Sequence, residues 1–214
     1  METPIKTRPI NYIVFEGLEG SGKSTQVKLF YEALRKENPK CILAKEPDYE
    51  SKLGKMIKSE LVEKTNPLGI MGMQFFFVAE RYERFIRFTI PKMAEGHTII
   101  SDRNWFSTAV HVAAFAPKPY SDLEWMSEVH SKLPLPQVVF FIDVPSKVAF
   151  ERINHRGNEK RQYDKVESLE AQEDAYRQLS KKYDPIWCRI DGNQAPEAVH
   201  KEIMKAWQKL NTVK

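Results

Sequence analysis

One short stretch constrains this chain more than any other: GLEGSGKS, from Gly17 to Ser24. It matches the pattern GxxxxGK[ST], and it stands between the apolar run YIVFE and a segment with helical periodicity. Glycines in such a loop let successive backbone N–H groups converge on a phosphate at the N-terminus of a helix. The lysine of the pattern, Lys23, reaches the β- and γ-phosphates, and the hydroxyl of Ser24 coordinates Mg²⁺. The stretch therefore predicts that the chain binds ATP or a similar triphosphate with Mg²⁺. The expected binding residues are Gly17, Leu18, Glu19, Gly20, Ser21, Gly22, Lys23, Ser24 and Thr25.

Five apolar runs, rich in β-branched and aromatic residues, predict the strands of one sheet. They are apolar throughout rather than alternating, as expected for strands that are covered on both faces. Helical segments separate them, which predicts a parallel sheet sandwiched by helices, the P-loop NTPase form of the α/β class. The expected strands are residues 12–16, 41–45, 98–102, 138–143 and 186–191. The expected helices are residues 22–37, 51–64, 68–95, 105–116, 121–132, 145–156, 165–183 and 195–210, with Pro91 kinking or ending the third.

Length and charge limit the class of protein further. A chain of 214 residues suits one domain over 1–214, with residues 1–10 as a flexible tail. The net charge is only +4 and acidic residues interrupt every basic run, so no nucleic-acid partner is expected. Cys41 and Cys188 stand in apolar runs and form no disulfide framework, which favours a reducing compartment. No apolar segment has the length of a membrane span, and a cytoplasmic protein is expected.

Triphosphate binding leaves kinases, GTPases and motors as classes of function. A GTPase needs a guanine-reading NKxD sequence, which is absent, and a motor usually needs a longer chain. A small-molecule kinase remains, and it requires a second site for the phosphoryl acceptor.

The stretch SDRNWFSTAV (101–110) follows the third expected strand and supplies candidates for that second site. Ligands bind at the carboxyl ends of strands in such sheets, so Asp102 and Arg103 are expected to face the crevice. An arginine grips a phosphate bidentately, and Asp102 is the preferred further ligand for Mg²⁺. Asp143 competes for that role, but it precedes Pro145 and is interpreted as a helix N-cap.

The stretch FFFVAERYERF (75–85) carries rings and arginines at helical spacing. Phe75 and Phe76 are expected to pack in the core. Phe77 and Arg81 are four residues apart and share a helix face, where a ring and a guanidinium can bind a nucleobase.

Together these stretches resemble the thymidylate kinase family, which phosphorylates dTMP to dTDP. The resemblance runs from about Tyr12 to Trp207. It rests on FEGLEGSGKSTQ (15–26), KEP (45–47), FVAER (77–81), SDRNWFST (101–108), FIDVPSKVAFERINHRG (141–157) and IDGNQAPEAV (190–199).

The resemblance implies roles for individual residues. Glu19 approaches the 3′-hydroxyl of the acceptor sugar, Phe77 stacks on thymine, and Arg81 hydrogen-bonds the edge of the base. The substrate-binding residues that it implies, with those from the motifs above, are Glu19, Pro47, Phe77, Arg81, Arg103, Thr108 and His111. The family is usually dimeric, and the apolar stretch 68–79 is a candidate interface for a homodimer.

The charged segment 156–165 is expected to form a short lid. Some family members carry an arginine in the phosphate loop where this chain has Gly20, and others carry basic residues in the lid. Here the lid offers Arg156, Lys160 and Arg161, which are expected to assist Lys23 and Arg103 in catalysis. The acceptor phosphate is already anionic, so no general base is needed.

Two departures from the family's pattern bear on dTMP preference. Pro47-Asp48-Tyr49 lacks an expected arginine or glycine, and His111 stands where a tyrosine or phenylalanine is usual. Thr108 fits the family.

Two alternatives and one unexplained residue remain. In a deoxynucleoside kinase, Glu46 would be the general base for a 5′-hydroxyl, with Gln74 and Arg81 reading the nucleobase. A nucleotide-binding regulator without catalysis is the other. Glu16, inside the motif region, is expected to pair with Arg103.

Overall fold

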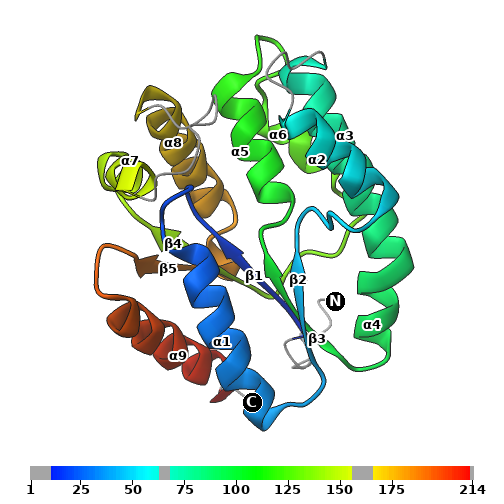
Figure 1. Cartoon of the computed structure of the whole chain (residues 1–214). Helices are drawn as coiled ribbons and strands as arrows, with labels where there is room; N and C mark the ends of the chain where they lie inside the picture. The colour runs from blue at the N-terminus through cyan, green and yellow to red at the C-terminus, as the bar shows by residue number, and fades with distance from the viewer. Residues whose placement is uncertain (1–10, 63–67, 156–165, 213–214) are drawn as a thin grey trace, which may run out of the picture.

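A parallel sheet of five strands, in the order β2-β3-β1-β4-β5, lies between two layers of helices in the computed structural model (Figure 1). The structure describes residues 11–62, 68–155 and 166–212. The strands are β1 (Tyr12–Glu16), β2 (Cys41–Lys45), β3 (Thr98–Asp102), β4 (Val138–Asp143) and β5 (Trp187–Asp191). The helices include α1 (Lys23–Glu37), α2 (Lys52–Val62), α3 (Gly69–Arg84), α4 (Ile90–Ala94), α5 (Trp105–Phe115), α6 (Leu123–Val129), α7 (Ser146–His155), α8 (Val166–Lys182) and α9 (Pro196–Thr212). This arrangement confirms the predicted fold class.

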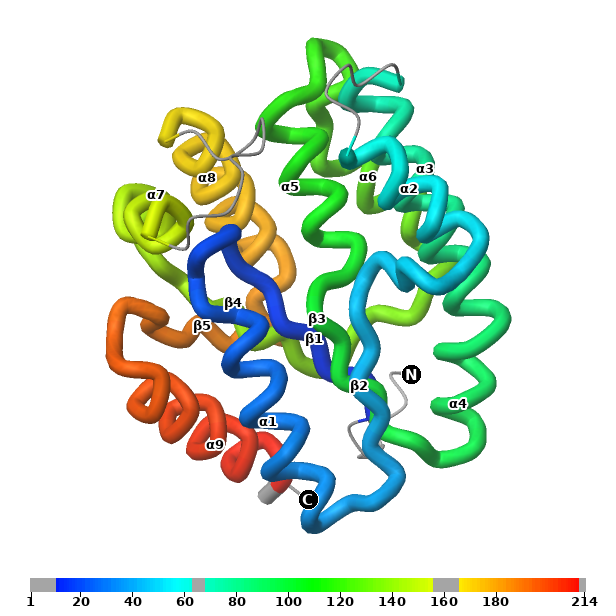
Figure 2. Tube along the Cα trace, in the orientation of Figure 1, coloured from blue at the N-terminus to red at the C-terminus, as the bar shows by residue number. Residues whose placement is uncertain are grey.

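The alternation of side chains along β1 builds two separate cores. Ile13 and Phe15 point to one face, which α1 and α9 cover side by side (Figure 2). Tyr12 and Val14 point to the other face, where they pack against residues of α5 and α8. All four side chains are buried, so β1 is covered on both faces, as its apolar sequence predicts.

The central position of β1 determines where the site forms. Its neighbours are β3 and β4, and the register pairs Phe15 with Asp102. The loop after β1 and the Asp102–Arg103 stretch after β3 therefore meet at one edge of the sheet, where ligands bind in folds of this type.

Most predicted boundaries agree with the structure. The long third helix, predicted over 68–95, is instead divided into three helical segments. Helix α3 ends at Arg84, a π-helical turn (η1, Phe85–Thr89) follows, and α4 resumes with Pro91 in its first turn. Pro91 has no N–H to donate within a regular helix, and the wider turn just before it accommodates that loss. Strand β5 begins one residue later than expected, because a 3₁₀ turn (η2, Asp184–Ile186) precedes it.

Two predictions about single residues have different outcomes. The expectation that Phe75 packs in the core is wrong: its side chain is 46% exposed, and its ring packs edge-on against Trp125 at 5.9 Å. Cys41 and Cys188 are both free, as expected. No helix among the described residues is long and apolar enough to cross a membrane.

Candidate active site

The loop between β1 and α1 contains a position, Gly20, where there is no room for any side chain. Gly20 has φ 80°, and a Cβ there would lie 2.4 Å from the carbonyl oxygen of Ala149 on α7. Gly20 is thus required by packing, and an arginine does not fit at this position. Gly22 (φ 87°) precedes α1, and no described side chain caps this helix. The amides of Thr25 and Gln26 donate to the Gly22 carbonyl, and the N–H groups of Lys23 and Ser24, at the very start of the helix, are available to an anion.

Lys23, Ser24 and Asp102 form one cluster beside the loop. The Nζ of Lys23 lies 2.9 Å from Oδ1 of Asp102, and the Ser24 hydroxyl donates to Oδ2 at 3.1 Å. Burial alone would raise the pKa of Asp102, but Lys23 and Arg103 lower it below its usual value. Burial lowers the pKa of Lys23, and Asp102 opposes that shift. The carboxylate is therefore ionised and oriented by two neighbours from α1.

The oxygen atoms of this cluster suit Mg²⁺. Hydroxyl and carboxylate oxygens are the ligands that Mg²⁺ prefers, and it usually takes only one or two protein ligands besides phosphates and water. Among the described residues there is no group of three or more His, Cys, Asp or Glu side chains that could hold a metal alone. The Ser24 and Asp102 oxygens therefore suit a Mg²⁺ ion that is also bound by a phosphate.

A cavity of about 290 Å³ opens beside this cluster, and α1, α2, α3, α5, α8, β2 and β3 all contribute residues to its lining. Lys23, Ser24 and Asp102 lie at one part of its lining. All seven residues predicted to bind the acceptor also line it: Glu19, Pro47, Phe77, Arg81, Arg103, Thr108 and His111. The remaining loop residues contribute differently. The side chain of Leu18, for example, is buried in the core, so only its backbone can face a phosphate.

Arg103 is held at the cavity by an unusual backbone and several contacts. Its φ is 76°, which is costly for a residue with a side chain, by about 1–3 kcal/mol. The Ser101 hydroxyl donates to its carbonyl at 2.8 Å, which supports this conformation. Its guanidinium donates to Ser107 Oγ at 2.8 Å and lies 3.7 Å from Oε2 of Glu19. The side chain is 21% exposed, so it remains accessible to a ligand.

Glu16 explains how Arg103 is supported. Its carboxylate accepts hydrogen bonds from the Asn104 amide at 2.9 Å, the Ser107 hydroxyl at 2.8 Å and the Tyr176 hydroxyl at 2.8 Å. The predicted pair with Arg103 is confirmed at 3.8 Å. Burial raises the pKa of Glu16, while Arg103 and the three donors favour its charged form. The carboxylate is a structural support behind the cavity rather than a group that meets the ligand.

Tyr176 is a functional residue that the sequence did not predict. It lies on α8, far along the chain, and its hydroxyl contacts Glu16, Ser107 and Arg103. A lone tyrosine in an amphipathic helix gives no signal of such a role. Other residues line the cavity although they were not predicted to bind the substrate of a monophosphate kinase. They include Gln74, Asn104, Ser107, Leu169 and Gln172.

Glu46 is ion-paired on both sides, which bears on the deoxynucleoside kinase alternative. Its Oε2 lies 2.6 Å from Nε of Arg81, and its Oε1 pairs with Arg84. The side chain is 2% exposed. Both carboxylate oxygens are thus engaged by arginines of the protein itself, rather than left to accept the proton of a substrate hydroxyl.

Asp143 has a different partner from the one expected. Its carboxylate pairs with Arg189 on β5 at 2.5 Å, and the amide of Ser146, at the start of α7, donates to Glu173 instead. The predicted lid residues Arg156, Lys160 and Arg161, with the rest of 156–165 and the tail 1–10, lie outside the described residues.

Comparison with known proteins now gives the family. The family model described as thymidylate kinase matches residues 15–203. The chain belongs to the thymidylate kinase family. It is 34% identical over 207 residues to the thymidylate kinase of Rickettsia bellii strain OSU 85-389, a match that covers 94% of this chain and 97% of that one. It is 30% identical over 202 residues to the probable thymidylate kinase of Thermococcus kodakarensis, covering 90% and 95% of the two chains.

Solved structures agree on the fold. The thymidylate kinase of Candida albicans superposes with a TM-score of 0.80 at 21% identity, covering 93% of this chain and 91% of that one. The thymidylate kinase of Ehrlichia chaffeensis gives 0.71 at 24% identity, covering 93% and 98%. Membership of the thymidylate kinase family makes the chain a nucleotide kinase, and neither the deoxynucleoside kinase nor the non-catalytic regulator is favoured.

Proposed function

We propose that this protein transfers the γ-phosphoryl group of Mg-ATP to the 5′-phosphate of dTMP, giving dTDP and ADP. The observation that carries the proposal is that one cavity is lined both by Lys23, from the phosphate loop, and by Arg103, from the stretch after β3. A kinase of this kind needs two cationic anchors, one for each phosphate-bearing substrate.

On the donor side, Lys23 and the uncapped N-terminus of α1 bind the ATP phosphates. Ser24 and Asp102 would hold Mg²⁺, directly or through water, and the bound ion would neutralise part of the phosphate charge. Asp102 also keeps Lys23 directed toward the loop through their 2.9 Å contact.

On the acceptor side, Arg103 grips the phosphate of dTMP and Glu19 accepts a hydrogen bond from the 3′-hydroxyl. Their guanidinium and carboxylate lie 3.7 Å apart, so both can contact one nucleotide. Phe77 stacks on thymine, and Arg81 and Thr108 contact its edge. Pro47 and His111 complete the lining.

The chemical step needs no general base. A phosphate oxygen of dTMP attacks the γ-phosphorus, the bond to the bridging oxygen breaks, and ADP leaves with that electron pair. Lys23 and Arg103 stabilise the charges that are brought together and shared in this step.

We also propose that the protein acts as a homodimer. Large apolar side chains are exposed on α2, α3 and the helical segment after α3, including Phe75 (46%), Ile86 (67%) and Ile90 (40%). Ile86 and Ile90 lie one turn apart, so they belong to one apolar face. Light scattering on the protein and on an Ile86→Asp, Ile90→Asp variant tests this: a dimer that becomes a monomer is expected, and a wild-type monomer would contradict it.

The function is tested by measuring ADP formation from Mg-ATP with dTMP, dUMP, dCMP, dGMP, UMP and thymidine as separate acceptors. We expect rapid turnover with dTMP, less with dUMP, and none with thymidine. Turnover with thymidine and none with dTMP would refute the proposal.

A further inference from the structure

Arg81 is the cavity residue whose guanidinium is most completely held by the protein. Its Nε donates to Glu46 at 2.6 Å. One terminal nitrogen contacts both Thr108 Oγ1 at 3.2 Å and His130 Nε2 at 3.1 Å. The other donates to the carbonyl of Asn104 at 3.4 Å. Four of the five N–H groups are thus engaged within the described chain, which leaves one for a ligand in the cavity that Arg81 lines.

His130 contributes one of these contacts, and its hydrogen bonds determine its tautomer. Its Nδ1 lies 2.8 Å from the carbonyl oxygen of Met126, which can only accept, so Nδ1 carries the proton. Arg81 can only donate, so the Nε2 of His130 must be unprotonated. Both contacts are satisfied only by a neutral imidazole. Burial and the charge of Arg81 lower the pKa of His130 to about 4, in agreement with this state.

The surroundings of the imidazole fix its plane. The ring is 2% exposed and stacks on Trp105 with the ring centres 5.4 Å apart and the planes inclined by 17°. Tyr82, on α3, is nearly parallel to it at 6.4 Å, and the Tyr82 hydroxyl donates to the neighbouring Val129 carbonyl at 2.6 Å. The acceptor nitrogen therefore has one direction in which to meet Arg81.

We propose that His130 is a positioning residue for base selection: its Nε2 fixes Arg81 so that the remaining N–H donates to a carbonyl oxygen of the pyrimidine base. This inference rests on the proposed function. A base with a carbonyl at that position satisfies the donor, whereas a base with an amino group opposes it with a second donor. His130 touches no substrate and acts through Arg81.

Two substitutions of His130 distinguish the role of Nδ1 from that of Nε2. In His130→Asn the short amide can replace Nδ1 against Met126, but it does not reach Arg81. In His130→Gln the longer amide places an oxygen near the position of Nε2, where it can accept from Arg81. Kcat and KM are measured for each variant with dTMP and with dCMP, and thermal unfolding is followed in parallel.

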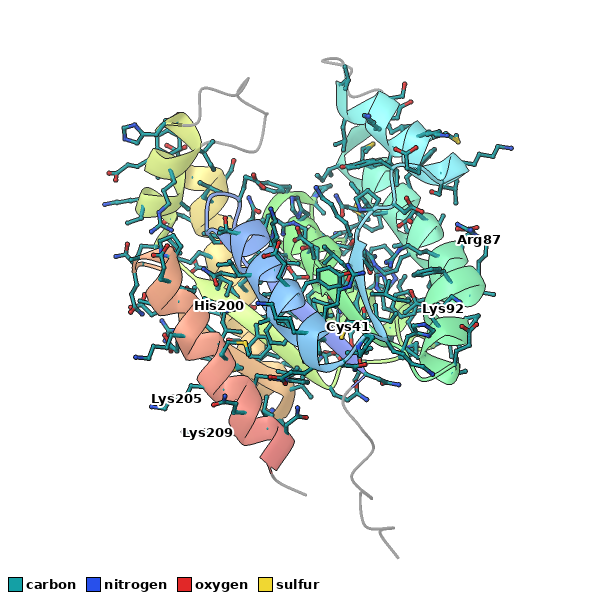
Figure 3. The ribbon with its side chains drawn as sticks, turned by 60° about the horizontal axis from the view of Figure 1, so that its bottom comes forward. Cys41, Arg87, Lys92, His200, Lys205 and Lys209 are labelled. Atoms are coloured by element: carbon teal, nitrogen blue, oxygen red, sulfur yellow. The ribbon has the colours of Figure 1, made fainter. Side chains whose placement is uncertain are left out.

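We expect His130→Asn to lower the dTMP-to-dCMP ratio of kcat/KM about 10-fold or more, mainly by raising KM for dTMP. His130→Gln is expected to retain the ratio within about 3-fold of wild type. His200→Asn, on α9 against the opposite face of the sheet, is the matched control and should leave the ratio unchanged (Figure 3). Dissociation constants for dTMP and dCMP without ATP provide the same comparison if a variant turns over slowly.

A double-mutant cycle tests whether His130 acts through Arg81. In an Arg81→Met background, His130→Asn should cause no further loss of selectivity. The inference is overturned if Asn and Gln have equal effects, if neither changes the ratio, or if the two losses add. A wild-type protein that does not phosphorylate dTMP at all would instead refute the proposed function.

Discussion

The hydroxyl of Tyr176, on α8, donates a hydrogen bond of 2.8 Å to Oε2 of Glu16, at the end of β1. The same hydroxyl lies 3.2 Å from Arg103, so one side chain connects α8, the central strand and an arginine that lines the cavity. The Tyr176 side chain is buried, and both burial and the charge of Glu16 raise the pKa of its phenol. The phenol therefore keeps its proton and donates it to the carboxylate.

Replacing Tyr176 by phenylalanine removes that donor and leaves Arg103 less constrained. Hydrogen bonds to charged groups contribute about 1.5–3 kcal/mol, so we expect kcat/KM for dTMP to fall about 10-fold or more. Steady-state kinetics with dTMP as the varied substrate measures the effect. Tyr183→Phe removes a hydroxyl that bonds Ser127 at 2.5 Å outside the cavity, and serves as the control. Equal effects of the two substitutions would contradict a specific role for Tyr176.

Glu46→Gln tests whether this carboxylate is structural or catalytic. The substitution removes the charge that faces Arg81 and Arg84, and breaking a buried ion pair costs about 3–5 kcal/mol. We expect a large decrease in the free energy of unfolding, measured by urea denaturation, with dTMP turnover weakened but present. Glu83→Gln, which breaks only an exposed pair with Arg87, should change stability little, because such surface pairs are screened by solvent. Loss of all turnover in a folded Glu46→Gln protein would contradict a purely structural role for this carboxylate.

The sequence predicted the residues that belong to a local motif better than the residues that support them. Lys23 and Ser24 have a fixed spacing in the chain, and Asp102 and Arg103 follow a recognisable strand, so their meeting follows from the order of the strands. Tyr176 reaches Glu16 across 160 positions, and no local pattern marks that contact. The exposure of Phe75 was missed for a similar reason, because an apolar residue in a helix indicates burial but not what covers it.

Asp102→Asn tests the predicted Mg²⁺ ligand. The variant keeps the shape of the side chain but removes its negative charge. In the wild type, one carboxylate oxygen lies 2.9 Å from Nζ of Lys23 and the other accepts a hydrogen bond from Ser24. Loss of such a ligand or its support typically reduces metal affinity or activity 10- to 100-fold. We expect the Mg²⁺ concentration for half-maximal rate to rise by about that factor, as measured by titration at fixed ATP. Asp143→Asn, which affects only the pair with Arg189, is the control, and an unchanged Mg²⁺ requirement in Asp102→Asn would contradict the assignment.

The role of residues 156–165 as a lid stays a prediction, and a triple substitution tests it. Alanine at Arg156, Lys160 and Arg161 removes the cations that are expected to reach the transferred phosphoryl group. Because Gly20 leaves no room for a loop arginine, no cation from that position can replace them. By comparison with arginine fingers, we expect kcat to fall about 10³-fold or more, with little change in dTMP affinity. Nearly unchanged turnover would show that the lid assignment is wrong.

The neutral state of His130 predicts how stability depends on pH. Its pKa is lowered from 6.5 to about 4 in the folded protein, so between these values the unfolded chain binds a proton that the folded protein does not. Above about pH 7 the imidazole is neutral in both states, so protonation of His130 does not affect stability. As the pH falls toward 4, the unfolded chain takes up a proton and the free energy of unfolding decreases. From the two pKa values, the free energy of unfolding should decrease by about 2 kcal/mol between pH 7.5 and pH 5 because of this residue alone.

Comparison with a variant isolates the share of His130 from that of the carboxylates. His130→Gln has no titrating group at this position. Over the same pH range its free energy of unfolding should therefore decrease by about 2 kcal/mol less than that of the wild type. Urea denaturation at pH 7.5, 6.5, 5.5 and 5.0 measures both proteins. Parallel pH profiles would contradict the prediction, because they would require the imidazole to be equally protonated in the folded and unfolded states. A smaller decrease in the variant would support the neutral imidazole, whose Nε2 accepts the Arg81 N–H at 3.1 Å.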